Sequence, residues 1–187
     1  MFLDRDGVLN EPIVRQGRTY PPTSIVALKI IPGVPAACKR LRSLGFLLAM
    51  VTNQPDIARG IASVDDVTQI NRHLQLALNL DSVWVCPHDD EDGCACRKPS
   101  PGLILDAALH HSVDLPSSFM VGDRWRDIAA GNTAGCHTVL LLEPRNLELN
   151  NEKADWVTGD LIGAARWIAA LETRGGPAPI QPQGGTT

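Results

Sequence analysis

The sequence lacks the features that mark membrane proteins, secreted proteins and nucleic-acid-binding proteins. No apolar run approaches the roughly 20 residues that a transmembrane helix needs, and the N-terminus has neither the basic region nor the cleavage site of a signal peptide. Seventeen basic residues stand against twenty-one acidic ones, without the basic excess that binding to nucleic-acid phosphates usually needs. These absences predict a cytoplasmic protein with no membrane or nucleic-acid partner.

The chain is short, and its apolar content suits one compact unit. It has 187 residues, of which 44% are hydrophobic, so a sizeable core is expected and a second domain is not. We expect a single domain over residues 1–173 and a disordered tail over residues 174–187, where Gly, Pro and Gln dominate. A monomer is the default expectation.

Apolar runs and helical periodicities alternate along the chain. Continuous apolar runs, typical of strands buried on both faces, occupy 46–51, 83–85, 119–121 and 138–142, with a shorter candidate at 156–157. Segments with helical spacing and end signals lie at 33–44, 63–78, 100–110, 123–133 and 160–172. This alternation predicts a Rossmann-like α/β fold, a doubly wound parallel sheet whose ligands bind beyond the carboxyl ends of the strands.

Two aspartates come directly after the first apolar segment. Asp4-Arg5-Asp6-Gly7 follows Met1-Phe2-Leu3, so two carboxylates leave the end of a short strand, as an aspartate nucleophile and its acid/base partner would. Only three residues precede Asp4, so we expect a short first strand or a shortened N-terminus. A calcium loop would need a glutamate at its twelfth position, where this chain has Arg15. A solvated turn is the remaining alternative.

Further polar residues follow the other predicted strands. Carboxyl ends of parallel strands lie at one edge of a sheet, so all these side chains are expected to converge. They are Asp4 and Asp6 after the first strand, Thr52, Asn53 and Gln54 after the second, Lys98 before the helix that leads to the fourth, and Asp123 after the fourth. A solvated turn would not produce such convergence, which indicates a catalytic site.

Three of the five cysteines share one short loop with a histidine. Cys86-x-His88 and Cys94-x-Cys96 supply three thiolates and one imidazole, enough to close a tetrahedral zinc shell. A closed shell leaves no position for a reacting water, so we expect a structural Zn²⁺ that holds the loop. Free thiols are the alternative. A redox pair at Cys94 and Cys96 is disfavoured, because redox motifs normally space their thiols by two residues.

Together these residues resemble a known superfamily. Asp4-x-Asp6-Gly7, Thr52, Lys98 and Gly122-Asp123 with Asp127 are similar to the four motifs of the haloacid dehalogenase superfamily of phosphotransferases. More narrowly, the chain resembles the zinc-containing heptose-1,7-bisphosphate 7-phosphatases, with the histidinol-phosphate phosphatase domains as near relatives. The segments that carry this closer resemblance are Val51-Thr52-Asn53-Gln54, Ala58-Arg59-Gly60, Cys86-Pro87-His88 and Cys94-Ala95-Cys96-Arg97-Lys98-Pro99.

The resemblance and the chemistry of the residues imply a mechanism for hydrolysis of a phosphate ester. Asp4 would attack phosphorus and form an aspartyl phosphate, while Asp6 would protonate the leaving alkoxide and then activate water. A catalytic Mg²⁺ would be held by a side-chain oxygen of Asp4, the backbone carbonyl of Asp6, and Asp123. The remaining expected roles are Lys98 as the opposing charge, Thr52 on the phosphoryl oxygens, and Asp127 behind the metal ligands, orienting Lys98 or a metal-bound water.

The expected substrate is a small phosphorylated sugar. Predicted sheet and helices fill the intervals between the motifs, so we expect a capless enzyme whose site is shaped by the loop at 10–23 and by the zinc loop. The candidates to bind substrate are Asn53, Gln54, Arg97 and Arg124. The preferred reaction is removal of the C7 phosphate of D-glycero-D-manno-heptose 1,7-bisphosphate. Histidinol-phosphate hydrolysis is the alternative, and a zinc-stapled binding module would leave the aspartates without a role.

Overall fold

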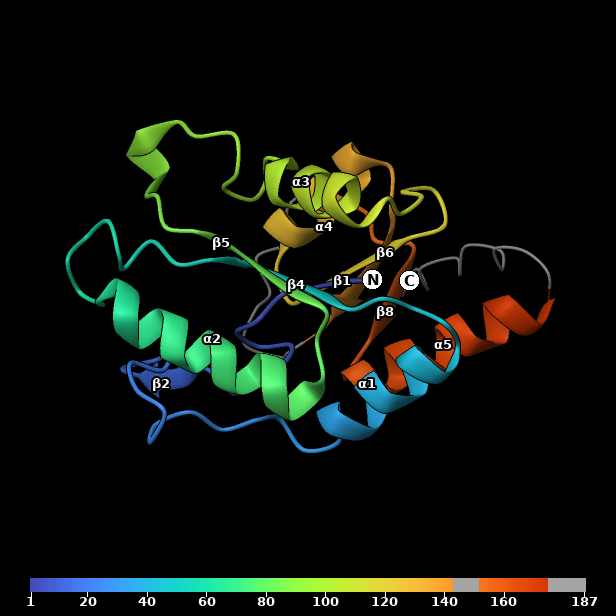
Figure 1. The fold of residues 1–187 in the computed structure, drawn as a ribbon, viewed down its shortest axis with the longest axis horizontal. Coiled ribbons are helices and arrows are strands. Elements are labelled where there is room, and N and C mark those ends of the chain that lie inside the picture. Colours follow the sequence, from blue (N-terminus) through green and yellow to red (C-terminus); the bar gives the residue numbers. More distant parts are fainter. Residues whose placement is uncertain (143–151, 175–187) are drawn as a thin grey trace, which may run out of the picture.

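The computed structural model describes residues 1–142 and 152–174, and its centre is a six-stranded parallel sheet (Figure 1). The strands are β1 (Phe2–Leu3), β4 (Ala49–Asn53), β5 (Ser82–Cys86), β6 (Phe119–Gly122), β7 (His137–Leu141) and β8 (Trp156–Thr158), in the order β5-β4-β1-β6-β7-β8. The chain runs from β1 outward to β5, then returns to β6 on the other side of β1. The switch point therefore lies between β1 and β6, where doubly wound sheets bind ligands beyond the strand ends.

Helices cover both faces of this sheet (Figure 1). One face carries α1 (Val34–Ser43), α2 (Val64–Leu78) and α5 (Leu161–Arg174), and the other carries α3 (Gly102–His111) and α4 (Trp125–Ala134). Leu3 and Met50 belong to the core under the first layer, whereas Phe2 and Val51 belong to the core under the second. The strands are thus buried on both faces, which confirms the predicted doubly wound α/β fold.

The second strand is displaced from its predicted position. An apolar run predicts a strand at 46–51, but β4 spans Ala49–Asn53. Phe2, the first residue of β1, pairs with Ala49, while Leu47 and Leu48 accept backbone hydrogen bonds from Met1 and Asp81 outside the named strands. The displacement places Thr52 and Asn53 at the end of β4, on the edge of the sheet where ligands bind.

The ends of the helices follow their local sequence signals. Ser63 Oγ accepts a hydrogen bond from the backbone N–H of Asp66 at 3.0 Å before α2, and Asp160 Oδ1 accepts one from Gly163 at 2.7 Å in α5. Gly135 ends α4 with a φ of 84°, a conformation that glycine adopts without strain. Ser63 and Asp160 are also the residues at which the two helices are predicted to begin, in the ranges 63–78 and 160–172.

The segment at 10–23 is a hairpin, not the loop that the sequence predicts. β2 (Ile13–Arg15) and β3 (Arg18–Tyr20) pair in antiparallel fashion, and Gln16 and Gly17 turn between them with φ values of 49° and 75°. Two positive φ values at a two-residue turn match the twist of a hairpin. The prediction is wrong because three-residue strands show too little alternation and Gln-Gly is a weak turn signal.

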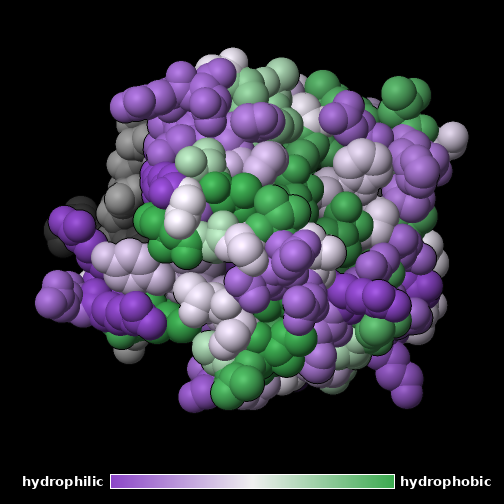
Figure 2. Space-filling view, turned by 60° about the vertical axis from the view of Figure 1, so that its left-hand side comes forward, coloured by the Kyte–Doolittle hydropathy of each residue, from purple (hydrophilic) through white to green (hydrophobic). Residues whose placement is uncertain are grey.

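No cap domain is inserted in the described ranges. The segment from β1 to β4 holds the hairpin and α1, and the segment from β4 to α3 holds α2, β5 and a loop with a short 3₁₀ helix, η1 (Asp90–Asp92). No described helix is long and apolar enough to cross a bilayer. On the face drawn in Figure 2, clusters of hydrophobic residues are divided by hydrophilic ones. The expected tail lies outside the described residues, apart from Arg174 at the end of α5.

Candidate active site

Asp4 and Asp123 meet at the switch point of the sheet. Asp4 follows β1, and its backbone N–H donates to the carbonyl of Val121 in β6 at 3.0 Å, while Asp123 follows β6. Both residues are buried, with exposed fractions of 8% and 3%. Carboxylate oxygens of Asp4, Asp123 and Asp127 all lie within 4.8 Å of one another. The structure therefore brings together the acidic residues of the first and last predicted motifs.

The crowding of these carboxylates disfavours their joint ionisation. Burial raises the pKa of Asp4 to about 6, with Lys98 opposing this rise and the charge of Asp127 adding to it. Burial likewise raises the pKa of Asp123 to about 8, and the charges of Asp127 and Asp4 contribute. Since buried like charges need a compensating cation before all can ionise, the cluster has the electrostatics of a cation site.

Mg²⁺ fits this donor set, because it is a hard ion that prefers carboxylate oxygens. Asp127 is already engaged, since its Oδ1 is 2.6 Å from Lys98 Nζ and its Oδ2 accepts the backbone N–H of Arg124 at 3.1 Å. Asp4 and Asp123 are therefore the side chains suited to hold the ion, while Asp127 orients Lys98 and caps the start of α4.

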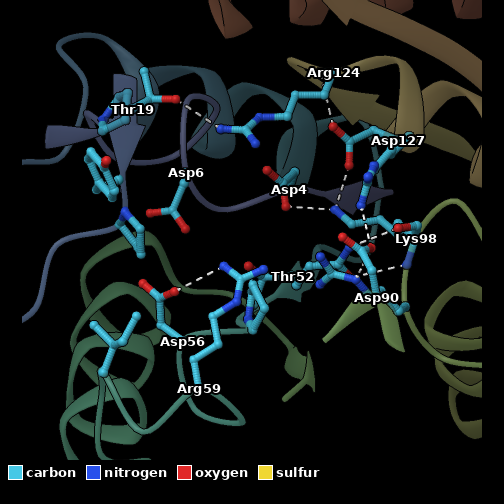
Figure 3. Close-up of a pocket in the computed structure, with 18 of the residues that line it drawn as sticks. Asp4, Asp6, Thr19, Thr52, Asp56, Arg59, Asp90, Lys98, Arg124 and Asp127 are labelled. Atoms are coloured by element: carbon cyan, nitrogen blue, oxygen red, sulfur yellow. Dashed lines mark hydrogen bonds and ion pairs between the residues drawn. The ribbon is translucent and has the colours of Figure 1, made fainter. Parts of the chain in front are cut away.

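Lys98 is a buried cation between two carboxylates (Figure 3). Its Nζ lies 2.6 Å from Asp4 Oδ1 and 2.6 Å from Asp127 Oδ1, and it donates to the carbonyl of Val51 at 2.9 Å. Burial favours the neutral amine, but the charges of Asp127 and Asp4 outweigh this effect and raise the pKa of Lys98 above its usual range. The site thus holds a fixed positive charge beside Asp4.

Asp6 is held by three side chains behind the site. Both of its oxygens accept hydrogen bonds from the guanidinium of Arg5, Oδ1 also accepts from Asn10 at 3.0 Å, and Oδ2 accepts from Gln54 at 2.9 Å. Gln54 also donates to the hydroxyl of Thr52 at 2.9 Å. Gln54 is only 2% exposed and is absent from the cavity wall. The prediction that it binds substrate does not fit this geometry, because its amide is engaged beneath the site.

Thr52 and Asn53 end β4 beside the reacting region. Thr52 lines the cavity and is 1% exposed. The amide of Asn53 forms two hydrogen bonds with the backbone of Lys98, donating to its carbonyl at 2.9 Å and accepting from its N–H at 3.1 Å. Asn53 thus joins the end of β4 to the segment that carries the lysine, a role that the sequence does not reveal.

Arginines surround a cavity of about 570 Å³ above this cluster (Figure 3). Arg97 and Arg126 both donate to Asp90 Oδ1, each at 2.8 Å, and these hydrogen bonds, first that of Arg97, lower the pKa of Asp90 to about 2. Arg124 donates to Thr19 of the hairpin at 3.1 Å. The predicted Arg97 and Arg124 both line the cavity. The sequence predicts no role for the other lining arginines, which are Arg15, Arg59 and Arg126.

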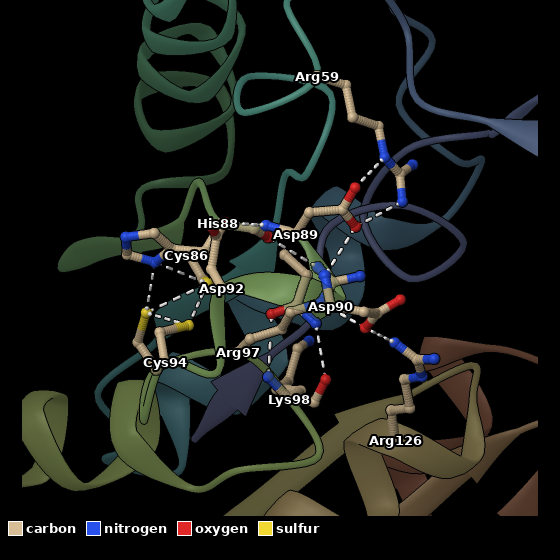
Figure 4. Close-up of polar contacts among 12 residues, drawn as sticks. Arg59, Cys86, His88, Asp89, Asp90, Asp92, Cys94, Arg97, Lys98 and Arg126 are labelled. Atoms are coloured by element: carbon tan, nitrogen blue, oxygen red, sulfur yellow. Dashed lines mark hydrogen bonds and ion pairs between the residues drawn. The ribbon is translucent and has the colours of Figure 1, made fainter.

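The four predicted zinc ligands form one cluster (Figure 4). Donor atoms of Cys86, His88, Cys94 and Cys96 all lie within 4.8 Å of one another, and the contacts among them measure 3.1 to 3.6 Å. Tetrahedral bonds of about 2.3 Å to sulfur place neighbouring ligands roughly 3.7 Å apart, close to these separations. All of these cysteines are free thiols. The cluster therefore fits a closed Zn²⁺ site.

Two consecutive aspartates connect the zinc loop to the cavity rim (Figure 4). Asp89 binds the guanidinium of Arg59 through two hydrogen bonds of 2.6 Å each, and Asp90 binds Arg97 and Arg126 as described above. Arg59 precedes α2 and Arg126 lies in α4. The loop thus bridges segments on both sides of the site, and its order determines where these arginines point.

Gly7 allows the close approach of Asp123, and Gly7→Ala is expected to weaken Mg²⁺ binding by about tenfold or more, equivalent to roughly 1.4 kcal/mol. Gly7 has a φ of 90°, and a Cβ at this position would collide with the carboxylate of Asp123. Titration calorimetry with Mg²⁺ measures the effect. Gly17→Ala is the matched control, because Gly17 has a φ of 75° but nothing within 4 Å of its Cβ position. Equal losses of Mg²⁺ affinity in both variants would contradict this explanation.

Comparison with known proteins gives one consistent result. Residues 95–164 match the model of HAD-hydrolase-like proteins. The chain is 39% identical to D-glycero-β-D-manno-heptose-1,7-bisphosphate 7-phosphatase from Helicobacter pylori over 76% of this chain and 82% of that protein. It is 34% identical to the enzyme of the same name from Yersinia pestis over 91% of this chain and 95% of that one.

Solved structures agree with the sequence relatives. The D,D-heptose 1,7-bisphosphate phosphatase from B. bronchiseptica, complexed with magnesium and phosphate, superposes with a TM-score of 0.76 at 31% identity, over 91% of this chain and 97% of that one. The phosphatase of the same name from Burkholderia thailandensis gives a TM-score of 0.63 at 25% identity, over 88% and 94% of the two chains. The chain therefore belongs to the heptose-1,7-bisphosphate 7-phosphatase family of HAD-like hydrolases.

Proposed function

We propose that this protein removes the C7 phosphate of D-glycero-D-manno-heptose 1,7-bisphosphate in a Mg²⁺-dependent reaction through an aspartyl phosphate. The observation that carries the proposal is the arrangement of Asp4, Lys98 and Asp123 at the switch point, with the lysine ammonium 2.6 Å from the proposed nucleophile. Relatives that span nearly the whole chain bear the name of this activity. Both lines support the same reaction.

Asp4 is the proposed nucleophile, because it lines the cavity while its contacts with Lys98 and Val121 fix its position. One oxygen is paired with Lys98, which leaves Oδ2 to attack phosphorus in line with the leaving oxygen. Lys98 and the Thr52 hydroxyl stabilise charge on the phosphoryl oxygens as the bond to Asp4 forms. Mg²⁺ bound by Asp4 and Asp123 would offset the electrostatic repulsion between the Asp4 carboxylate and the phosphate of the substrate.

Asp6 is the proposed acid/base. Its side chain borders the cavity next to Asp4, so its proton can pass to the leaving alkoxide in the first step. As a carboxylate it then takes a proton from the water that hydrolyses the aspartyl phosphate. One group serves both steps, since the proton lost in the first is regained in the second.

The rim arginines are proposed to recognise a second anionic group of the substrate. Arg97 and Arg126 point at one carboxylate oxygen of Asp90, which shows that two guanidinium groups can share an anion here. A phosphate at C1 of the sugar has the charge to engage them. The names of the relatives from Helicobacter pylori and Yersinia pestis favour the β anomer.

Phosphorus NMR identifies the substrate and the phosphate that leaves. The protein is incubated with Mg²⁺ and either anomer of the heptose 1,7-bisphosphate, or with histidinol phosphate. We expect loss of the C7 resonance, retention of the C1 resonance, and faster turnover of the β anomer. Faster turnover of histidinol phosphate would identify that compound as the substrate instead. Comparable turnover of unrelated monoesters would contradict specificity for the heptose bisphosphate.

Arg97→Gln is expected to raise KM for the bisphosphate by about tenfold to one hundredfold while changing kcat little, because a charge-assisted hydrogen bond contributes about 1.5–3 kcal/mol. Turnover of a sugar monophosphate should be affected much less, since it lacks the second anion. Steady-state kinetics on both substrates, with zinc content measured alongside, tests this. Arg42→Gln is the control, because Arg42 pairs with Asp81 outside the cavity. Equal effects on both substrates would exclude recognition of the second phosphate by Arg97.

We infer a cytoplasmic location as well, because three cysteines that form no disulfide and are grouped at a candidate zinc site suit a reducing compartment. A single domain over 1–173 is part of the same proposal. The monomeric state and the lack of a nucleic-acid partner stay predictions.

A further inference from the structure

Arg5 stands between the two active-site aspartates in sequence, yet it is fully buried, with an exposed fraction of 0%. Its Nε donates to Asp6 Oδ2 at 3.1 Å, and its Nη2 lies 2.9 Å from the same oxygen and donates to Oδ1 at 3.2 Å. Among the described residues, Asp6 is the acidic group that forms an ion pair with Arg5. A charge removed from water needs such partners, because its desolvation is otherwise strongly unfavourable.

Two neutral acceptors hold the guanidinium from the other side. Nη1 donates to Asn71 Oδ1 at 2.9 Å, and Nη2 donates to Gln54 Oε1 at 2.9 Å. Asn71 lies in α2 and is 4% exposed, while Gln54 follows β4. The guanidinium is planar and rigid, so these contacts fix its orientation as well as its position.

The backbone of Arg5 also shapes the turn that carries Asp6. Its carbonyl accepts hydrogen bonds from Leu9 at 2.8 Å and from Asn10 at 3.1 Å. Asn10 in turn donates from its side chain to Asp6 Oδ1 at 3.0 Å. Both carboxylate oxygens of Asp6 are thereby located by groups that depend on Arg5, directly or through this turn.

We propose that Arg5 is a positioning residue for proton transfer: anchored by Asn71 and Gln54, its guanidinium holds the Asp6 carboxyl group where it meets the leaving oxygen. The inference rests on the proposed acid/base role of Asp6. It extends the site to α2, a helix that contributes no other group to the reaction. The competing explanation is that Arg5 only holds the Asp4-Asp6 turn against α2 and so stabilises the fold. It predicts that a change of Arg5 lowers turnover of all substrates to the same extent.

Leaving-group dependence separates the two explanations. An alkyl phosphate needs its alkoxide protonated, whereas p-nitrophenyl phosphate releases a stable phenolate without help from an acid. Arg5→Met is expected to lower kcat/KM, which covers only the steps up to formation of the aspartyl phosphate, about tenfold to one hundredfold on the alkyl phosphate that the unmodified protein turns over fastest. The loss of kcat/KM on p-nitrophenyl phosphate should be less than about threefold. Arg5→Lys keeps the charge but loses the planar guanidinium with its several donors, so its loss should be smaller than that of Arg5→Met.

A double-mutant cycle with Asp6→Asn completes the test. Arg5→Met is expected to cause less than about a twofold further loss in the Asp6→Asn background, because the group it positions is gone. Equal losses of kcat/KM on both substrates, or multiplicative losses in the double variant, would overturn the proposal. If Asp6→Asn itself shows no dependence on the leaving group, the acid/base role of Asp6 is wrong and the inference falls with it. If the loss in Asp6→Asn depends on the leaving group but the loss in Arg5→Met does not, Asp6 is still the acid/base and only the positioning role of Arg5 is wrong.

Asn71→Leu provides a second route to the same result, since it leaves Arg5 and Asp6 in place. It should show the same substrate selectivity in kcat/KM, with a smaller loss. Leu74→Ala is the matched control on the same helix, because Leu74 is buried in the core and its apolar side chain forms no hydrogen bond with these polar groups. It should lower Tm without changing the ratio of the two kcat/KM values. A changed ratio in Leu74→Ala, or an unchanged ratio in folded Asn71→Leu, would contradict the proposal.

Discussion

Asp4→Asn is expected to lower kcat for phosphate release by roughly 10⁴-fold or more, the largest loss predicted for this protein. The substitution replaces the attacking carboxylate by a neutral amide. It also removes one carboxylate of the proposed Mg²⁺ site. Little else changes, because the backbone N–H of Asp4 keeps its bond to Val121 and Lys98 keeps its pair with Asp127. Phosphate release is measured at saturating Mg²⁺, with circular dichroism to establish that the fold is retained.

Asp56→Asn is the matched control for that loss. Asp56 also lines the cavity, but it pairs with Arg59 at the rim and lies outside the cluster of Asp4, Asp123 and Asp127. Its kcat should stay within a few-fold of the unmodified protein, since exposed ion pairs contribute little. Substantial Mg²⁺-dependent turnover by folded Asp4→Asn would contradict the assignment of the nucleophile.

Cys96→Ala is expected to prevent binding of the proposed structural Zn²⁺, to lower Tm markedly and to remove most of the activity. Structural zinc sites contribute apparent binding free energies of about 10–16 kcal/mol, and a loop this polar has little else to order it. Cys96 is followed directly by Arg97 and Lys98, so disorder at the cysteine displaces the charge opposite Asp4. Metal analysis, thermal unfolding and kinetics on the same preparation measure the three effects.

Cys136→Ala is the control for removal of a thiol. Cys136 is a buried core residue that lies outside the metal cluster, so the variant should keep its zinc and lose only packing energy. A strong chelator should reproduce the Cys96→Ala result in the unmodified protein. Full activity and an unchanged Tm after removal of zinc would contradict a structural role for the metal.

The parts of the site that the sequence predicts are those fixed by strand ends. Asp4 follows an apolar run directly and Asp123 follows one after Gly122, and the carboxyl ends of parallel strands must share one edge of the sheet. Their convergence across more than a hundred residues of chain follows from the topology alone. The zinc ligands are predicted for a different reason, since all four belong to a single loop and their spacing does not depend on the rest of the fold.

What the sequence does not predict depends on side-chain direction. Gln54 stands beside Thr52 and Asn53 in the chain, and only the bend after β4 turns its amide inward to Asp6. Arg5 is an ordinary charged residue until its burial is known. The ion pairs of Asp90 join a loop to α4, and no periodicity reports such a contact.

Trapping the covalent intermediate shows directly whether Asp4 is the nucleophile. Asp6→Asn protein is mixed with p-nitrophenyl phosphate and Mg²⁺, quenched in acid and analysed by mass spectrometry, because this substrate needs no acid to form the intermediate and the variant lacks the base that removes it. We predict one phosphoryl group on Asp4, which borohydride reduction converts to homoserine at that position. Phosphorylation of another residue, or turnover without a phosphoryl group on Asp4, would contradict the account.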